Sequence, residues 1–164
     1  MLSFLRTSRV LPLIAAAGLL AAGATTQLAT AQDMSAAEQS AIAHVESMTD
    51  AYRTNDVDGY LGHYAKELTW WGPGGRGSWD AYHSSWTDYV ANQGGVASAE
   101  ISDVVAQVTP SGDAAVVSYL LTADYRSSDG SVSRSNIQMS TSMMMQDGGW
   151  KIVHLHFQSR PDAD

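Results

Sequence analysis

The 164-residue sequence contains no cysteine, which excludes disulfide bonds, thiol chemistry, a lipid-anchored cysteine and metal sites built on thiolates. It also contains no glycine-rich phosphate loop, dinucleotide fingerprint or serine nucleophile elbow. Phenylalanine is scarce, with two residues against five tryptophans and seven tyrosines. Most of the aromatic side chains therefore carry a hydrogen-bonding group as well as an apolar ring.

Basic residues are few, and two of the nine lie close to the N-terminus. Arg6 and Arg9 precede a short apolar run over residues 11–22 and the small residues Ala29-Thr30-Ala31. This order predicts a signal peptide over residues 1–31 and a periplasmic or secreted protein. The run is shorter than the roughly 20 residues of a spanning helix, so we expect no membrane segment after cleavage. Residues 32–164 then form a single domain of 133 residues.

Negative charge dominates this predicted domain. All 17 acidic residues and only seven of the nine basic ones belong to it, so its formal charge is −10 with histidine neutral. Such a surface repels phosphates and anionic lipids. We therefore expect small molecules or other proteins as partners, and no nucleic acid.

Helical patterns come first and strand patterns follow, which indicates an α+β fold. Ser35 and Glu38 form a capping-box pair at the start of an amphipathic helix that extends to about residue 54. Asn55 or Asp56 can cap a second helix over 57–64, a short strand covers 67–71, and Ser78 can cap a third helix. From residue 96 the apolar pattern alternates, with turns at 110–113, 128–130 and 147–149. This predicts an antiparallel meander of four long strands, which must coil to stay compact.

Three motifs carry a family resemblance: Asn55-Asp56-Val57-Asp58, Gly77 before the third helix, and the final strand Gly149-Trp150-Lys151-Ile152-Val153-His154. With them the chain resembles the nuclear transport factor 2-like superfamily, which includes SnoaL-like cyclases, ketosteroid isomerase and the calcium/calmodulin-dependent kinase association domain. The last of these is most similar in the final strand. The resemblance spans nearly all of residues 32–164. It implies a cone-shaped, curved antiparallel sheet covered by three N-terminal helices around a cavity.

Strand alternation predicts which side chains face that cavity. If residues 147–149 form a three-residue loop with a bulge, the odd positions of the last strands point inward and the even positions form the outer surface. The inward set then includes Tyr119, Met139 and Phe157. A two-residue loop would reverse the two faces.

The candidate catalytic residues are His83, Tyr119 and Tyr64. His83 lies one helical turn from Trp79 and Trp86, where burial would bring a general base near neutral pKa, and a tyrosine would hold a developing oxyanion. Alternatively, His83 is an exposed helical residue near Asp80. We expect a ring-bearing ligand to contact Trp70, Tyr82, Trp86, Met139 and Phe157.

The chemistry of the relatives does not transfer residue by residue. The segment Trp70-Trp71-Gly72-Pro73 has no carboxylate where the isomerases place a base, and no histidine occurs near Val96, where the dehydratases place one. His154 and His156 share one side of the final strand but lack an evident third metal ligand. We expect no metal and no cofactor, and a homodimer formed through this outer sheet face.

These patterns predict an exported protein with a small-molecule pocket. The preferred function is a cofactor-independent acid/base enzyme, a lyase, isomerase or dehydratase, acting on a hydrophobic ring-containing substrate. The alternative is a non-catalytic ligand-binding or dimerisation module.

Overall fold

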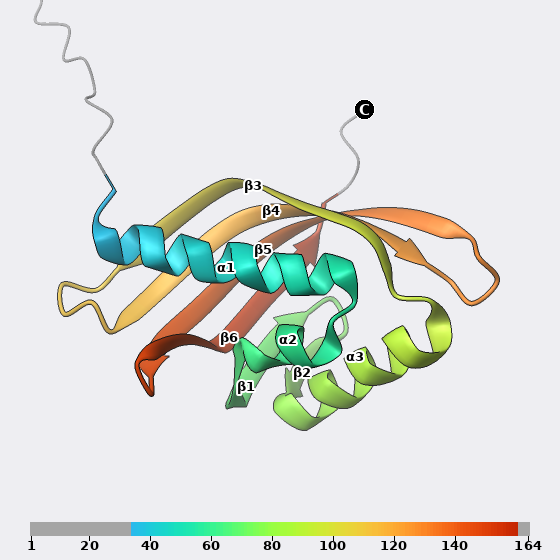
Figure 1. Ribbon diagram of the computed structural model, residues 1–164, viewed down its shortest axis with the longest axis horizontal. Coiled ribbons are helices and arrows are strands. Elements are labelled where there is room, and N and C mark those ends of the chain that lie inside the picture. The colour runs from blue at the N-terminus through green and yellow to red at the C-terminus, as the bar shows by residue number, and fades with distance from the viewer. Residues whose placement is uncertain (1–33, 161–164) are drawn as a thin grey trace, which may run out of the picture. The chain divides into compact units, whose positions relative to one another are not determined.

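The computed structural model describes residues 34–160, so the predicted signal peptide lies outside the described part of the chain (Figure 1). The helices are α1 (Ala36–Thr54), α2 (Val57–Gly62) and α3 (Trp79–Gln93). The strands are β1 (Tyr64–Gly72), β2 (Gly75–Ser78), β3 (Val96–Val108), β4 (Ala114–Arg126), β5 (Val132–Gln146) and β6 (Gly149–Ser159). The predicted α+β class and the four-strand meander are confirmed. Between residues 34 and 160, no helix is both long and apolar enough to span a membrane.

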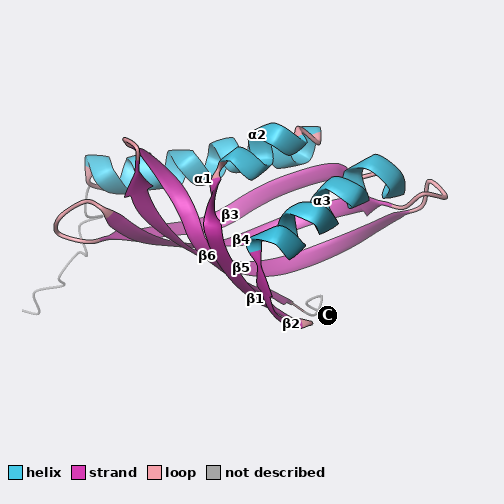
Figure 2. Ribbon diagram, turned by 90° about the horizontal axis from the view of Figure 1, so that it is seen from below, coloured by secondary structure: helices cyan, strands magenta, loops and turns pink. Residues whose placement is uncertain are grey.

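The six strands form one sheet in the order β2-β1-β6-β5-β4-β3. Neighbouring strands are antiparallel except β1 and β6, which run parallel. The sheet is strongly curved, and α1 and α3 lie on its concave side (Figure 2). This is the predicted cone-shaped arrangement, in which the helices leave part of the concave face uncovered.

Helix α1 begins where the sequence predicts. The Ser35 hydroxyl accepts a hydrogen bond from the Glu38 amide at 3.2 Å, and the Ser35 amide donates to the Glu38 carboxylate at 2.7 Å, which completes the capping box. The buried side of the helix follows three- and four-residue spacing, as an amphipathic helix on a core requires. Its buried residues are Ala41, Val45, Met48, Thr49 and Tyr52.

The junction between α1 and the sheet depends on Asn55. Of the two residues predicted as the N-cap of α2, Asp56 has this role. Its side-chain carboxylate accepts a hydrogen bond from the Gly59 amide at 3.0 Å. Asn55 has a left-handed backbone with φ 58° and instead bonds the first residue of β3. Its side-chain amide donates to the Val96 carbonyl at 2.9 Å and accepts from the Val96 amide at 2.7 Å. The asparagine thus acts as a strand partner and fixes the end of α1 against β3.

The first strands differ from the sequence prediction. Helix α2 ends at Gly62, so Tyr64 is the first residue of β1 rather than the last of a helix. The glycine-rich segment after β1 does not only turn but returns as β2, which pairs with β1 over Thr69–Gly72. The ring of Trp70 lies against Gly77 in this hairpin, where an added Cβ would come within 2.2 Å of the indole. Gly77 is therefore required by packing.

The turn between β5 and β6 is a two-residue turn, not the three-residue loop on which the inward assignment depended. Asp147 and Gly148 both have positive φ, 49° and 81°, and Gln146 pairs with Gly149. The inward positions near the turn are therefore even on β6, namely Trp150 and Ile152. A bulge opposite Ser142 and Met143 then shifts the register, so that Leu155 and Phe157 face inward. On β6 the predicted odd set is thus correct only beyond the bulge, whereas odd residues of β4 and β5, such as Tyr119 and Met143, are buried as predicted.

Candidate functional site

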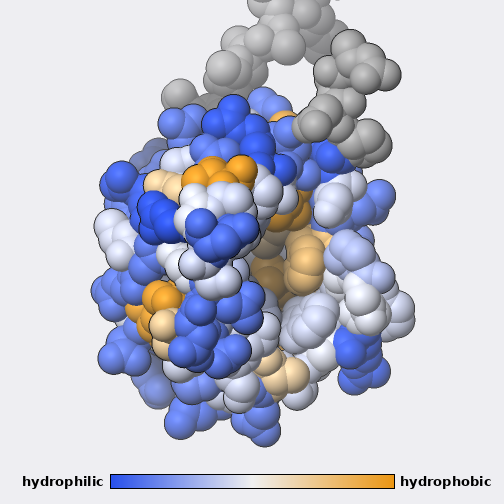
Figure 3. Space-filling model, turned by 90° about the vertical axis from the view of Figure 1, so that its right-hand side faces the viewer, coloured by the Kyte–Doolittle hydropathy of each residue, from blue (hydrophilic) through white to orange (hydrophobic). Residues whose placement is uncertain are grey.

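A cavity of about 610 Å³ lies between the helices and the concave face of the sheet. Its mouth opens on the face shown in Figure 3, where hydrophobic residues lie at the bottom of a hollow. All seven tyrosines of the sequence line it. They are Tyr52, Tyr60, Tyr64, Tyr82, Tyr89, Tyr119 and Tyr125. Phenol groups therefore supply most of the polar surface inside the cavity.

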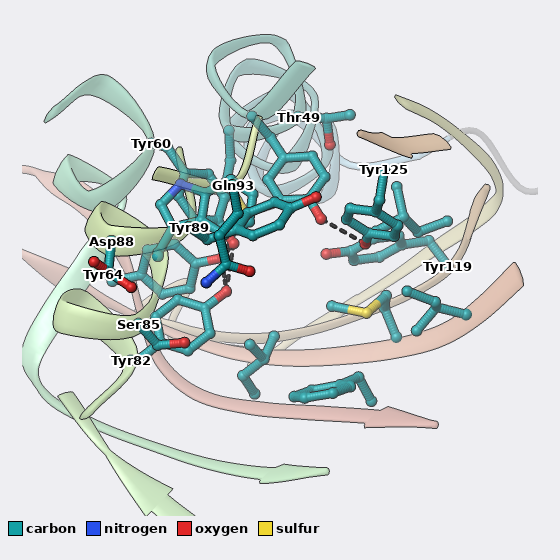
Figure 4. Close-up of a pocket in the computed structure, with 18 of the residues that line it drawn as sticks. Thr49, Tyr60, Tyr64, Tyr82, Ser85, Asp88, Tyr89, Gln93, Tyr119 and Tyr125 are labelled. Carbon is teal, nitrogen blue, oxygen red and sulfur yellow. Dashed lines mark hydrogen bonds between the residues drawn. The ribbon is translucent and has the colours of Figure 1, made fainter. Parts of the chain in front are cut away.

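The remaining lining residues divide into an apolar floor and a polar rim. The floor is formed by sheet residues, Leu121, Ile137, Met139, Leu155 and Phe157. The rim carries Ser85, Asp88, Gln93, Ser127 and Ser133 (Figure 4). Asp88 is exposed and is the one ionisable carboxylate among the lining residues; none of them is a lysine, an arginine or a histidine. The interior of the cavity thus has no fixed charge.

Three phenols form a hydrogen-bonded cluster at one side of the cavity. The Tyr64 hydroxyl donates to the Tyr60 hydroxyl at 2.7 Å, and the Tyr60 hydroxyl is hydrogen bonded to that of Tyr82 (Figure 4). The Tyr64 and Tyr82 oxygens are 3.5 Å apart. Burial raises the pKa of each of these phenols, and the neighbouring tyrosines add to the effect on Tyr60 and Tyr64. At neutral pH the cluster is protonated and offers hydrogen-bond donors.

A second pair of phenols lies nearer the mouth. The hydroxyls of Tyr52 and Tyr125 are 2.6 Å apart, and the Tyr89 hydroxyl lies within 3.1 Å of the Gly95 and Arg126 carbonyl oxygens. These bonds hold α1, α3 and the end of β4 together. The Tyr89 hydrogen and one of the two hydrogens of the Tyr52–Tyr125 pair are used in these bonds, so the rings provide most of the available surface there.

Tyr119 differs from the other six tyrosines. Its side chain is buried, at 3% exposure, and its hydroxyl has no hydrogen-bond partner among residues 34–160. The hydroxyl points toward the interior of the cavity (Figure 4). Burial, with a further contribution from Tyr82, raises the Tyr119 pKa strongly. Since a buried polar group without a partner costs free energy, this hydroxyl and the Trp86 indole nitrogen, which also lacks a partner among the described residues, are the groups of the cavity lining best placed to receive a partner from a ligand.

Six of the eight predicted site residues line the cavity: Tyr64, Tyr82, Trp86, Tyr119, Met139 and Phe157. The predicted placement of His83 is wrong. Its ring packs on Trp79 with centroids 5.3 Å apart, and it is exposed beside a separate surface hollow. Trp70 lies behind the cavity wall, stacked on Phe157 with centroids 5.8 Å apart. The cavity therefore contains no imidazole that could act as a base.

The sequence interpretation missed four tyrosines and one carboxylate. Tyr52, Tyr60 and Tyr89 lie in the predicted helices, at positions where helical periodicity indicates a buried face, and were not included among the predicted site residues. Tyr125 continues the inward alternation of Tyr119 on β4 and could have been included on that ground. Asp88 gave no signal, because a single acidic residue on an exposed helix is common.

One of the two histidines of β6, His154, has a structural partner. The His154 ring nitrogen Nδ1 is 2.8 Å from the Thr69 hydroxyl on β1, the strand parallel to β6. Throughout residues 34–160, no three histidine, aspartate or glutamate side chains lie together in the way a metal centre requires.

A curved sheet of this order, with helices on its concave side and a cavity between them, defines an α+β pocket protein of the nuclear transport factor 2-like type. Residues 42–161 match the SnoaL-like domain. The chain belongs to the SnoaL-like family. None of the curated proteins matches it.

Solved structures of low sequence identity share the fold. An NTF2-like protein from Rhodospirillum rubrum is 17% identical, with a TM-score of 0.64 over 73% of this chain and 98% of that one. A candidate scytalone dehydratase from Novosphingobium aromaticivorans is 14% identical, with a TM-score of 0.66 over 75% and 83%. A candidate calcium/calmodulin-dependent kinase II association domain from Exiguobacterium sibiricum is 10% identical, with a TM-score of 0.66 over 80% and 99%. The predicted superfamily and its association-domain similarity are confirmed.

Proposed function

We propose that the protein binds a ring-containing, largely apolar small molecule in the tyrosine-lined cavity, and that tyrosine hydroxyls hydrogen bond to an oxygen atom of this ligand. The observation that carries the proposal is the buried Tyr119 hydroxyl, which lacks a partner within the described residues and points into a cavity of about 610 Å³. Flat rings and an apolar sheet floor suit a ring system. A carbonyl or hydroxyl oxygen of the ligand would supply the missing acceptor.

Binding without turnover fits the lining residues best. Abstraction of a proton from carbon needs a general base within hydrogen-bond reach of the substrate. His83 lies outside the cavity, and Asp88 is exposed on the rim. The raised pKa values of the buried phenols keep them protonated, so they donate rather than accept protons.

A dehydratase is the second candidate, favoured by one feature. The hydroxyls of Tyr64, Tyr60 and Tyr82 form a continuous hydrogen-bonded chain that can pass a proton toward a leaving hydroxyl. A candidate dehydratase also shares the fold. The phenol chain would protonate the leaving hydroxyl, the departing water molecule would accept the proton of the adjacent carbon, and that proton would return to the phenolate.

The test is a thermal-shift screen of the purified protein against aromatic and polycyclic ketones, phenols and hydrocarbons. A pocket ligand raises the melting temperature by mass action. Tyr119→Phe should weaken binding of a ketone about tenfold, the equivalent of about 1.4 kcal/mol, and leave the matching hydrocarbon unaffected. If no compound stabilises the protein at millimolar concentration, the proposal is wrong.

Product analysis of the stabilising compounds separates binder from enzyme. Elimination of water that is lost in Tyr60→Phe supports the dehydratase. Unchanged ligands recovered after prolonged incubation support the binder.

We further propose that the protein is exported after cleavage near residue 31 and pairs as a homodimer through the outer sheet face. Val116 and Met144 are exposed there, at 39% and 49%, among serine and histidine side chains. Such a mixture of side chains suits a moderately polar interface.

Cell fractionation tests the export. Light scattering of the wild type and of Val116→Glu tests the dimer, which the substitution should dissociate.

A further inference from the structure

The mouth of the cavity is built from four aromatic rings, Tyr52, Trp86, Tyr89 and Tyr125, which we term the aromatic corner. Tyr52 stacks on Trp86 with centroids 4.8 Å apart and an interplanar angle of 15°. Tyr125 stands at 86° to Tyr52 and at 66° to Tyr89, with centroids 6.5 and 6.3 Å apart. The Tyr52–Trp86 stack thus forms one wall, and Tyr125 stands at a steep angle to it as a second wall of a partial box.

Tyr52 and Trp86 cover one face of each other, so the contact surface of the aromatic corner consists of the ring faces turned away from this stack. Tyr52 and Tyr125 bond each other, and the Tyr89 hydroxyl bonds the Gly95 and Arg126 carbonyl oxygens. The faces of aromatic rings carry negative electrostatic potential and attract cations within about 6 Å of the centroid. Alternating wall angles allow several faces to approach one compact charged group.

The charge beside the aromatic corner is negative, which is the sign that attracts a cation. Asp88 lines the mouth next to Tyr89 on α3, and no lysine, arginine or histidine lines the cavity. Arg126, the basic residue whose backbone the Tyr89 hydroxyl contacts, directs its guanidinium to the Gly94 carbonyl at 3.2 Å and is not among the lining residues. The whole chain carries a formal charge of −8. An anion would find no counter-ion among the lining residues.

We infer that the ligand of this cavity is an organic cation, a ring-bearing molecule whose tertiary or quaternary ammonium group lies in the aromatic corner beside Asp88. This inference rests on the proposed function and narrows its ligand class. The apolar floor then contacts the ring system, while the ammonium remains near the mouth, where part of its hydration is retained. Substituted ammonium ions suit ring faces better than phosphate or carboxylate groups do.

A matched ligand pair tests the charge alone. (3-Hydroxyphenyl)trimethylammonium and 3-tert-butylphenol have the same shape, with nitrogen replaced by carbon, and differ in one positive charge. A purely hydrophobic cavity prefers the neutral compound, because the ammonium loses more hydration on entering. If ring faces and Asp88 recognise the charge, the ammonium compound binds about tenfold more tightly in isothermal titration.

Single substitutions test which residues cause the preference for the ammonium compound. Asp88→Asn should weaken the ammonium compound about threefold and leave 3-tert-butylphenol unchanged, whereas Asp80→Asn, an exposed carboxylate on the same helix but outside the cavity, should change neither. Tyr89→Leu removes a ring face and should abolish the preference for the ammonium compound. Tyr89→Phe retains the face and should preserve it. Circular dichroism and melting temperature confirm that each variant is folded.

The outcomes separate this inference from the proposed function. Equal or tighter binding of the neutral compound overturns the cation inference and leaves a neutral-ligand pocket. Failure of both compounds, together with failure of the ketone and hydrocarbon screen, overturns the pocket function itself.

Discussion

The phenolic oxygens of Tyr52 and Tyr125 lie 2.6 Å apart and join the last turn of α1 to the end of β4, 73 residues later in the chain. Helix α1 otherwise packs mainly on β3. This one hydrogen bond therefore ties the helix to the strand that forms the far wall of the cavity mouth.

Two conservative tyrosine variants should have opposite effects on stability. Tyr52→Phe leaves the Tyr125 hydroxyl without its partner and should lower the free energy of unfolding by about 1 kcal/mol. Tyr119→Phe removes a hydroxyl that is already unpartnered in the described chain, so it should leave that free energy unchanged or raise it by up to about 1 kcal/mol. Urea unfolding of the ligand-free protein at neutral pH measures both. A clear loss of stability in Tyr119→Phe would contradict the assignment of a free hydroxyl.

Mild acid should destabilise the fold through His63. The His63 Nδ1 lies 3.4 Å from His44 Nε2, and burial, the His44 ring and Lys151 together lower the His63 pKa from 6.5 to about 4. A depressed pKa means that the unfolded chain binds the proton first. The contribution of the neutral His63 side chain to the free energy of unfolding is therefore fully present above pH 6.5. It is lost as pH falls from 6.5 toward about 4.

The measurement is the urea midpoint of the wild type and of His63→Gln between pH 7.5 and pH 4.5. The glutamine variant should lose less stability than the wild type over this interval, since it has no imidazole to protonate. Parallel curves for the two proteins would show that His63 is not the responsible group.

Asn55 offers a third prediction, on the fold itself. Asn55→Gly retains the left-handed backbone but removes both bonds to Val96, and should lower the free energy of unfolding by about 1 to 3 kcal/mol. Asn55→Ala should cost about 1 kcal/mol more, because alanine tolerates this backbone poorly. Chemical denaturation of the two variants separates the side-chain bonds from the backbone conformation. Equal losses would mean that the backbone at this position relaxes.

Gly72 controls the floor of the cavity. A Cβ at this position would lie 2.5 Å from the Phe157 ring, which lines the cavity, so Gly72→Ala should displace that ring and weaken ligand binding at least threefold. Gly74→Ala, two residues later in the same glycine-rich segment, meets no atom within 4 Å and serves as the control. Titration of any ligand from the thermal-shift screen compares them. Similar affinity in both variants would place Phe157 outside the binding surface.

Much of the fold could be predicted from the sequence because periodicity reports which side of an element is buried. The spacing that predicted α1 and the turns between the long strands is confirmed, and so is the inward direction of Tyr119. The alternation of inward and outward side chains along a strand predicts the buried face only between one β-bulge and the next. The bulge beside Ser142 reverses the face of β6 and leaves no clear mark in the residue types, while the two-residue turn at Asp147 was compatible with several loop lengths.

The error at His83 has a simple geometric cause. The residues of α3 that line the cavity are those at positions 82, 85, 86, 89 and 93, which follow helical spacing, and Asp88 at the rim. His83 is turned by about 100° around the helix from Tyr82, which lines the cavity, and its ring packs on Trp79 outside it. Proximity to two tryptophans along the sequence did not decide which face the histidine occupies.

Because every tyrosine of the sequence lines one cavity, phenol spectroscopy of this protein observes that cavity alone. Near-ultraviolet difference absorbance, nitration by tetranitromethane and alkaline titration of phenolate each become a direct gauge of occupancy, with no background from phenols elsewhere. A compound that enters should perturb the absorbance and protect the rings from nitration at the same concentration, before its chemical identity or fate is known.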